Sequence, residues 1–296
     1  MNGQALHRLQ AVVLDWAGTT VDFGCQGPLE AFMESFEAFG VPVLRDEARE
    51  PMGMKKRDHV AAMFAMPRIT AAWLIRHGEL PSEKDAHNVY TLAEHGMLSV
   101  VQRHSIPIAG AVNAVREMRR RGLSIGSCTG YPRSVAAPLA ENAAALGYAP
   151  DILVCATDVP HARPAPDMCI EALARLGVSD PARAVKIGDT LNDVYEGVRA
   201  GMWVIGLTLC GALIGVSEEE MSALSEEERN ILHDRASWKL INAGAHFTAP
   251  DLASCLPILD EIQRLNARDD FLGPENRPVS NPSSIAPEHA LLLQKQ

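Results

Sequence analysis

The sequence lacks several features that would assign it to common classes of protein. No apolar run approaches the roughly 20 residues that a membrane-spanning helix requires. Acidic residues outnumber basic ones, 37 to 27, and the resulting net charge of −10 argues against nucleic acid or an anionic membrane surface as a partner. Residues 1–10 contain no apolar core of a secretory signal. We therefore expect a globular, cytoplasmic protein.

Paired cysteine motifs and nucleotide-binding loops are absent as well. The six cysteines are scattered through mostly apolar stretches, with no C-x-x-C pair for a metal or a redox reaction. This usage predicts reduced thiols in the cytoplasm. Neither G-x-G-x-x-G nor G-x-x-x-x-G-K-[ST] occurs, so neither common nucleotide-binding fold is indicated.

The apolar run at residues 11–14 ends abruptly at a carboxylate, Asp15. A continuous apolar run of this length predicts a strand buried on both faces, as the central strands of parallel sheets are. Small residues follow at once, including Gly18, so the backbone beside the carboxylate can approach a ligand closely. Ligands of open α/β sheets bind at the carboxyl ends of the strands. Asp15 is therefore a candidate site residue, and a turn-forming Asp at a strand end is the alternative.

Strand and helix patterns alternate over most of the chain. Further strands are predicted at 123–128, 151–155, 184–188 and 202–207, and helices at 110–121, 133–146, 166–177 and 191–201. Acidic helical sequence follows at 217–244, and a short strand with a last helix at 246–265. Strands that alternate with helices form βαβ units, so the pattern predicts an α/β fold with a Rossmann-like, doubly wound parallel sheet.

One block departs from this alternation. After a short linker at 21–27, only helical patterns occur, at 28–40, 52–66, 69–78 and 82–104. We therefore expect an all-helical domain of residues 22–105, inserted after the first strand of a core formed by 1–21 and 106–270. Residues 271–296 are rich in Pro, Ser and Asn and are expected to form a loosely ordered tail.

Polar side chains follow four of the predicted strands, whose carboxyl ends meet at one edge of the sheet. They are Asp15, Thr129, the loop with Asp158 and Arg163, and Asp189 with Asp193. Hard divalent cations such as Mg²⁺ need several converging oxygen ligands, which Asp15 and the segment GDTLND at 188–193 supply. The four-residue spacing places Asp189 and Asp193 on one face of a helix start. The alternative is that these two residues only cap the helix and complement its dipole.

This arrangement resembles the haloacid dehalogenase superfamily. Its phosphotransferases carry an Asp nucleophile, a Thr or Ser, a Lys or Arg and an acidic metal-binding loop at successive strand ends. The resemblance implies that Asp15 is the nucleophile and that Thr129 and Arg163 hold phosphoryl oxygens. It also implies that Asp189 and Asp193 contribute to an Mg²⁺ site with Asp15, and that the inserted helices are the cap domain of these enzymes.

One residue departs from the superfamily pattern. Phosphatases of the superfamily usually have D-x-D, whereas this chain has Asp15-Trp16-Ala17, so the acid that protonates a leaving oxygen is missing. Without such an acid, departure of an alkoxide slows by ~10²–10⁴-fold. A carbon leaving group needs an electron sink instead.

The segment PMGMKKRDH at 51–59 offers such a sink. A lysine amine that condenses with an aldehyde becomes an iminium, which accepts the electrons of an adjacent carbanion. The amine must be neutral to condense, so its pKa must fall well below the ordinary value of about 10.4. A helix N-terminus, neighbouring cations such as Lys55 and Arg57, and exclusion of water all lower it. The alternative is a pair of lysines on a solvated helix face.

Together these features resemble the phosphonoacetaldehyde hydrolase family. The shared segments are DWAGTTVD (15–22), Cys25, PMG..K..H (51–59), CTGYP (128–132), DVP..RPAP (158–166) and GDTLND (188–193). The family pattern selects Lys56 over Lys55 as the Schiff-base lysine, because Lys56 is third after the Gly of the turn. It places the carbonyl of Ala17 on Mg²⁺. It also arranges around the substrate and the lysine Cys25, Met52, His59 and Tyr131. Gly53, a further candidate substrate-binding residue, allows a close approach of the backbone where the inserted helices meet the core.

The resemblance implies an activity: hydrolysis of the P–C bond of phosphonoacetaldehyde, a small-molecule phosphonate aldehyde, to acetaldehyde and phosphate. It further implies a homodimer and a place in 2-aminoethylphosphonate degradation. His59, three residues after Lys56, shares its helical face and is expected to move protons, while Asp193 is expected to reach the metal through water.

Three alternatives stay open from the residues. The first is a phosphomonoesterase or phosphomutase of the same fold. The second is a dehalogenase, which needs no metal and is disfavoured by the acidic loop at 188–193. The third is a phosphate-sensing domain with an inactive site, which the complete set of acids disfavours.

Overall fold

The computed structural model describes residues 8–267 and 274, and within them six strands form one parallel sheet. The strands are β1 (Ala11–Leu14), β2 (Ser124–Thr129), β3 (Ile152–Cys155), β4 (Ala184–Gly188), β5 (Trp203–Leu207) and β6 (Phe247–Ala249). Their order is β3-β2-β1-β4-β5-β6. At the end of the central strand, Leu14 is in register with Ser127 of β2 and Ile187 of β4. The predicted doubly wound parallel sheet is confirmed.

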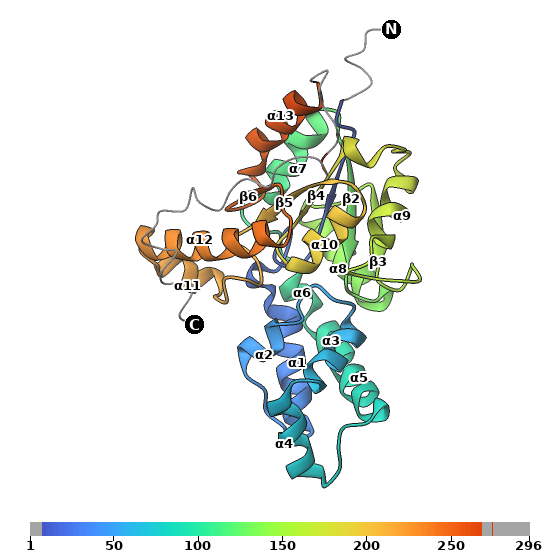
Figure 1. Ribbon diagram of the computed structural model, residues 1–296, viewed down its shortest axis with the longest axis vertical. Helices are drawn as coiled ribbons and strands as arrows, with labels where there is room; N and C mark the ends of the chain where they lie inside the picture. The colour runs from blue at the N-terminus through green and yellow to red at the C-terminus, as the bar shows by residue number, and fades with distance from the viewer. Residues whose placement is uncertain (1–7, 268–273, 275–296) are drawn as a thin grey trace.

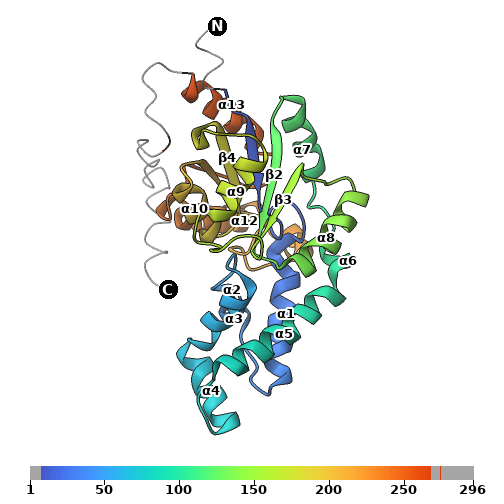
Figure 2. The same ribbon diagram turned by 90° about the vertical axis from the view of Figure 1, so that its right-hand side faces the viewer.

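Helices cover both faces of the sheet. On one face lie α7 (Ala111–Arg120), α8 (Arg133–Ala145) and α13 (Cys255–Asn266), and on the other α9 (Asp167–Arg175) and α10 (Leu191–Arg199) (Figure 2). Because successive side chains of a strand point to opposite faces, Val12 packs with the first group and Val13 with the second. The predicted acidic helical segment consists of α11 (Glu218–Ala223) and α12 (Glu226–Asn242), and α12 packs against β5 and β6.

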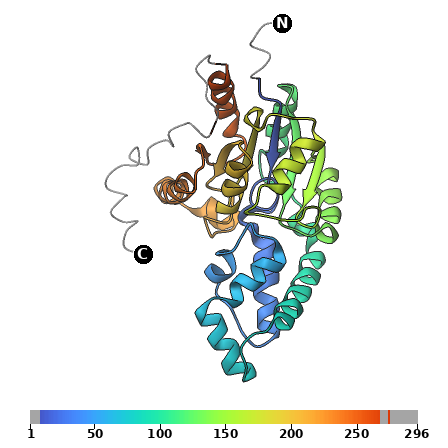
Figure 3. The ribbon, with the colours of Figure 1, turned by 45° about the vertical axis from the view of Figure 1, so that its right-hand side comes forward.

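Six helices lie between β1 and α7 in the chain. They are α1 (Gln26–Ala38), α2 (Arg45–Arg49), α3 (Lys56–Phe64), α4 (Pro67–His77), α5 (Glu83–Ser99) and α6 (Val101–His104). Figures 1 and 3 show this group below the sheet, on the side where the strands end. The insertion of helices after the first strand is thus present, and it covers the sheet edge at which the candidate residues were expected.

The largest differences from the predicted helices lie among the inserted helices. Helix α2 was missed because its only buried residue is Ala48, which leaves no apolar periodicity to detect. Helix α3 begins at Lys56 rather than at residue 52, because the preceding turn contains Gly53 at φ 87°, outside the helical region. The helix expected over 82–104 is divided at Val100, which has φ −114° and ψ 9° and is marked by no Pro or Gly.

Two adjacent linkers join the helical group to the sheet. Val21 and Pro107 pair as an isolated antiparallel bridge, and the Ile108 N–H donates to the Thr20 carbonyl at 2.9 Å. Nδ1 of His104, the last residue of α6, lies 2.7 Å from a carboxylate oxygen of Asp22 in the first linker. These contacts fix the entry and exit of the inserted helices side by side.

Other sequence expectations concern the termini and the cysteines. Apart from Pro274, the tail predicted over 271–296 lies outside the described residues. No helix in the described part of the chain is long and apolar enough to cross a membrane. All six cysteines are buried and free of disulfides, in agreement with the predicted reduced thiols.

Candidate active site

A pocket at the carboxyl ends of β1 and β2 brings most of the predicted site residues together. It is lined from both the sheet and the inserted helices by Asp15, Ala17, Cys25, Met52, Gly53, Lys56, Thr129, Gly130, Tyr131, Arg163 and Thr190. Of the predicted site residues, only His59, Asp189 and Asp193 are not among these lining residues. The juxtaposition of Asp15 with Lys56, which come from opposite sides of the pocket, was the central expectation from the sequence.

Asp15 follows β1 directly and continues its pairing. Its backbone N–H donates to the Ile187 carbonyl at 3.0 Å, which fixes the residue against β4. The residue is 5% exposed, and a carboxylate oxygen lies 2.8 Å from Arg163 Nη2. Burial raises the pKa of Asp15, and the charge of Arg163 opposes that shift. The carboxylate therefore borders the pocket with a fixed cation beside it.

Three carboxylates converge at this strand edge. Asp15, Asp189 and Asp193 are all buried, and each offers an oxygen within 4.8 Å of the others. Burial, followed by the charges of Asp15 and Asp193, raises the pKa of Asp189 to about 7. Converging oxygen donors suit a hard divalent cation, which would also offset the repulsion among the three carboxylates. The residues present therefore fit such a cation.

Asp189 is held in place by neighbouring donors. Thr19 Oγ1 donates to one carboxylate oxygen at 3.0 Å, and the Ala212 N–H donates to the other at 2.8 Å. Cys25 Sγ lies 3.4 Å from the same second oxygen. A Cβ on Gly18 (φ 81°) would fall only 2.6 Å from that oxygen, so the loop after β1 can close around the carboxylate only with glycine there.

Asp193 has two roles at once. It forms a capping box with Thr190, whose Oγ1 lies 2.6 Å from one carboxylate oxygen and accepts from the Asp193 N–H at 3.2 Å. The other oxygen lies 3.1 Å from both Arg163 Nη2 and Lys186 Nζ. Burial acts to raise the pKa of Asp193, but the charges of Arg163 and Lys186 outweigh it and lower that pKa. Helix capping and membership of the acidic cluster are thus both observed for Asp193, whereas the N-cap residue of α10 is Thr190 and not Asp189.

Two buried charged residues of this centre were missed from the sequence. Lys186 lies inside β4 and Glu196 on α10, both fully buried. Glu196 Oε2 is 3.0 Å from Lys186 Nζ and 2.8 Å from Arg163 Nε. The available signal was a lysine within the apolar run AVKIG, since a buried charge needs a partner. A glutamate three residues after Asp193, on the same helical face, was the matching signal.

Lys56 is the first residue of α3 and is 5% exposed. Its Nζ lies 3.9 Å from Met52 Sδ, 5.0 Å from the centroid of the Tyr131 ring and 5.9 Å from that of Phe32. Burial lowers the pKa of Lys56. The neighbouring Cys25 and Asp15 oppose this shift, and the charge of Arg163 adds to it. The lysine therefore lies in an apolar, aromatic part of the pocket that favours the neutral amine.

The adjacent Lys55 has a different environment. It is half-buried, serves as the N-cap of α3, and is not among the residues that line the pocket. The sequence argument attributed a lowered lysine pKa to Lys55 and Arg57 as neighbours, but Arg57 is exposed and the contributing cation is Arg163. Burial, rather than sequence neighbours, distinguishes Lys56.

The turn that carries Lys56 rests directly on the acidic loop. Asn192 Nδ2 donates to the Met52 carbonyl at 2.8 Å. A Cβ on Gly53 would fall 2.3 Å from Thr190 Oγ1, so the turn approaches the start of α10 more closely than any other residue would allow. The position of Lys56 is thereby tied to the loop that holds Asp189 and Asp193.

His59 lies one turn after Lys56 on α3 and is fully buried behind the pocket wall. Its Nε2 donates to the Ala48 carbonyl at 2.9 Å, which leaves Nδ1 as the unprotonated nitrogen, with no partner among the described residues. The ring stacks on Phe32 with centroids 4.0 Å apart. Burial, and next the charge of Lys56, hold the pKa of His59 well below its ordinary value, so the ring is neutral.

The remaining predicted residues complete the pocket wall. Cys25 Sγ donates to the Ala17 carbonyl at 3.1 Å, and burial followed by the charge of Asp189 raises the pKa of this thiol. Thr129 Oγ1 accepts from the Tyr131 N–H at 3.2 Å. Burial raises the pKa of Tyr131 well above its ordinary value. Both Cys25 and Tyr131 therefore stay protonated where they border the pocket.

A parallel sheet with an aspartate after its central strand, an acidic loop after the neighbouring strand and helices inserted between them defines a class of hydrolase. The family model of haloacid dehalogenase-like hydrolases matches residues 9–201. The fold and the site therefore place the chain among these enzymes.

Curated relatives narrow the class. A phosphonoacetaldehyde hydrolase of Nitratidesulfovibrio vulgaris is 41% identical over 262 residues, which cover 88% of this chain and 94% of that protein. One from Bacillus cereus is 40% identical over 257 residues, with coverage of 87% and 97%. The crystal structure of a phosphonoacetaldehyde hydrolase-like protein from Oleispira antarctica has a TM-score of 0.87 and 36% identity, covering 89% of this chain and 95% of that one. Among the haloacid dehalogenase-like hydrolases, the chain belongs to the phosphonoacetaldehyde hydrolase family.

Proposed function

We propose that this protein hydrolyses the P–C bond of phosphonoacetaldehyde to acetaldehyde and phosphate, within 2-aminoethylphosphonate degradation. The observation that carries the proposal is a buried lysine, Lys56, lining the same pocket as the buried carboxylate of Asp15. The relatives named for this activity support it. In this assignment residues 22–105 act as a cap domain over a core of residues 1–21 and 106–270, so both reacting groups meet only when the two are closed.

Asp15, Asp189 and the carbonyl of Ala17 would hold Mg²⁺. Asp193 would act through water, because one of its oxygens already faces Arg163 at 3.1 Å. When bound, the cation offsets negative charge on the phosphonate and on the attacking carboxylate.

Arg163 and Thr129 would hold the phosphonate oxygens. Arg163 is kept in one orientation by Glu196, 2.8 Å from Nε, and by the Cys128 carbonyl, which accepts from Nη2 at 3.1 Å. Its Nη2 also faces Asp15, so the guanidinium holds the phosphonate beside the nucleophile.

The chemistry begins at Lys56. Its neutral amine attacks the aldehyde carbon and forms an imine with loss of one water. The protonated imine then accepts the electron pair of the P–C bond as the Asp15 carboxylate attacks phosphorus, which gives an aspartyl phosphate and an enamine. Protonation of the enamine at carbon and hydrolysis by one water release acetaldehyde and Lys56. A second water releases phosphate and restores Asp15, so one water is consumed overall.

His59 is our candidate for moving protons to and from the lysine. It follows Lys56 by one helical turn, it is neutral, and its Nδ1 lone pair is free among the described residues. Cys25, Met52, Gly53 and Tyr131 line the pocket and would enclose the small aldehyde.

The test measures phosphate and acetaldehyde released from phosphonoacetaldehyde with Mg²⁺, with and without borohydride. We expect both products, loss of activity when borohydride and substrate are present together, and added mass on Lys56. Lys56→Met should abolish turnover and trapping, while the matched control Lys55→Met should keep both. Turnover of phosphate esters that survives Lys56→Met and is insensitive to borohydride would overturn the proposal and favour a phosphomonoesterase.

We also propose that the active form is a cytoplasmic homodimer, as the family resemblance implies. Light scattering on the purified protein is expected to give twice the mass of the 32.0 kDa chain. A mass of one chain at micromolar concentration would contradict this assignment.

A further inference from the structure

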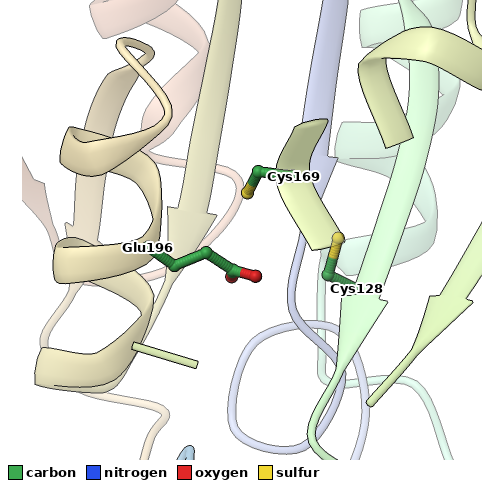
Figure 4. Close-up of side chains that lie close together, drawn as sticks. All are labelled: Cys128, Cys169 and Glu196. Carbon is green, nitrogen blue, oxygen red and sulfur yellow. The ribbon is translucent and has the colours of Figure 1, made fainter. Parts of the chain in front are cut away.

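Behind the three converging aspartates lies a second layer of buried charge. Glu196 Oε2 lies 2.8 Å from Arg163 Nε and 3.0 Å from Lys186 Nζ. The side chains of all three residues are at most 1% exposed. Figure 4 shows Glu196 reaching from α10 toward Cys128 of β2 and Cys169 of α9.

The two thiols do not neutralise this carboxylate. Cys128, Cys169 and Glu196 come within 4.8 Å of one another, which raises the question of a site for a thiophilic metal. However, Glu196 already faces two cations through Oε2, and both cysteines are packed in an apolar cluster with Met168 and Leu173. Glu196 Oε1 has no hydrogen-bond partner in the described part of the chain. Only one oxygen of the Glu196 carboxylate, Oε2, therefore contacts cations.

The charges of this buried centre do not balance. With all carboxylates ionised, the centre has four negative charges (Asp15, Asp189, Asp193 and Glu196) and two positive charges (Arg163 and Lys186), a net charge of −2. All of these carboxylates except Asp189 lie within ion-pair distance of a cation. Without Glu196, both cations would act on the three aspartates alone and leave a net charge of −1. A divalent cation is therefore matched in charge only when Glu196 is present.

We propose that Glu196 is a charge-setting residue for the divalent cation site. Its carboxylate compensates one unit of the positive charge of Arg163 and Lys186, which would otherwise act on Asp15 and Asp193. The aspartates therefore keep enough negative charge to hold the cation. The inference rests on the proposed function in one respect, namely that the acidic cluster of Asp15, Asp189 and Asp193 binds a divalent cation. It does not depend on the identity of the substrate.

Titration of the full-length protein with Mn²⁺, followed by electron paramagnetic resonance without substrate, tests the proposal. Glu196→Gln keeps the shape of the side chain and removes its charge, and we expect Mn²⁺ to bind about tenfold or more weakly. The double variant Lys186→Met with Glu196→Gln restores the net charge of the centre, so its affinity should return to within about threefold of the parent. Cys169→Ser, which changes a neighbour of Glu196 but no charge, is the matched control and should leave binding unchanged.

Two results with these variants would overturn the proposal. One is a folded Glu196→Gln variant, with the parent's circular dichroism, that binds Mn²⁺ as tightly as the parent. The other is a double variant as weak as the single one, because the effect would then come from the orientation of Arg163 rather than from charge. If Glu196→Gln fails to fold, the double variant is compared with the single variant Lys186→Met. Lys186→Met keeps the charge of Glu196 and should therefore bind Mn²⁺ about tenfold more tightly than the double variant.

The experiment is independent of the proposed reaction. A protein that binds Mn²⁺ in the expected order but does not hydrolyse phosphonoacetaldehyde would refute the proposed function and leave the role of Glu196 standing. A parent protein that binds no Mn²⁺ would overturn the role of Glu196.

Discussion

Replacing Gly53 with alanine should separate a defect in site assembly from a general loss of stability. Gly53 has φ 87°, and an added Cβ would fall 2.3 Å from Thr190 Oγ1 and 3.0 Å from Thr190 Cβ. Favourable contacts between heavy atoms lie near 3.5 Å, so the turn must move by about 1 Å away from α10. Lys56 follows three residues later and must move with it relative to Asp15.

Both parts of the perturbation have an expected size. A left-handed backbone costs an alanine about 1–2 kcal/mol, which lowers the melting temperature by several degrees in a protein of this length. A displacement of about 1 Å between reacting groups lowers a rate by ~10²-fold. We therefore expect kcat/KM for phosphonoacetaldehyde, measured by acetaldehyde release, to fall by ~10²-fold in Gly53→Ala.

Gly78→Ala is the matched control. Gly78 ends α4 with φ 79°, close to the φ of 87° at Gly53, but an added Cβ there has no atom within 4 Å. This variant should show a similar loss of melting temperature and the kcat/KM of the parent. Equal activity in the two variants would refute the argument that contact between the turn and Thr190 positions Lys56.

Three further predictions concern closure, protonation and the leaving group. Asn192→Ala removes the donor to the Met52 carbonyl, worth about 0.5–1.5 kcal/mol, so kcat/KM should fall about two- to tenfold; no change would mean that this bond does not hold the turn. Because burial lowers the pKa of Lys56 and only the neutral amine condenses, borohydride trapping should be lost as pH falls through that lowered pKa; a transition at or above the ordinary value of 10.5 would contradict this. Alkyl phosphates should react ~10²–10⁴-fold more slowly than p-nitrophenyl phosphate, whose leaving group needs no proton, and equal rates would reveal an unrecognised acid.

Much of the fold could be predicted because central strands such as β1 and β4 are short, largely apolar runs that are followed by a polar residue. Residues 11–14 and 184–188 show this pattern, and both are strands of the sheet. Helix α2 could not be predicted, because only Ala48 is buried in it and its contacts come from the fold. The break at Val100 is likewise unmarked by Pro or Gly and depends on how α5 and α6 pack.

The clustering of the candidate residues could be predicted where these residues follow strand ends. Asp15 and Asp189 were found in this way, since parallel strands bring their carboxyl ends together whatever the loops do. The pair Lys186–Glu196 was not found, because nothing in the spacing shows that β4 and α10 bring the two side chains to 3.0 Å. The family pattern selects Lys56 over Lys55, whereas the residues alone leave both lysines open. In the structure Lys56 begins α3 after the turn at Gly53 and lines the pocket.

The surroundings of Ala17 bear on which bond the site can break. Where phosphatases of the superfamily carry a second aspartate, this chain has a methyl group and a carbonyl that accepts from Cys25 Sγ at 3.1 Å. Among the residues that line the pocket, Asp15 is the sole carboxylate. Cys25 and Tyr131 also line the pocket and carry protons, but burial raises the pKa values of both side chains, so both are weak acids. A leaving oxygen would thus find little help, whereas a leaving carbon needs none from an acid if Lys56 takes its electrons. The absence of a second aspartate at Ala17 and the burial of Lys56 therefore both favour cleavage of a P–C bond over cleavage of a P–O bond.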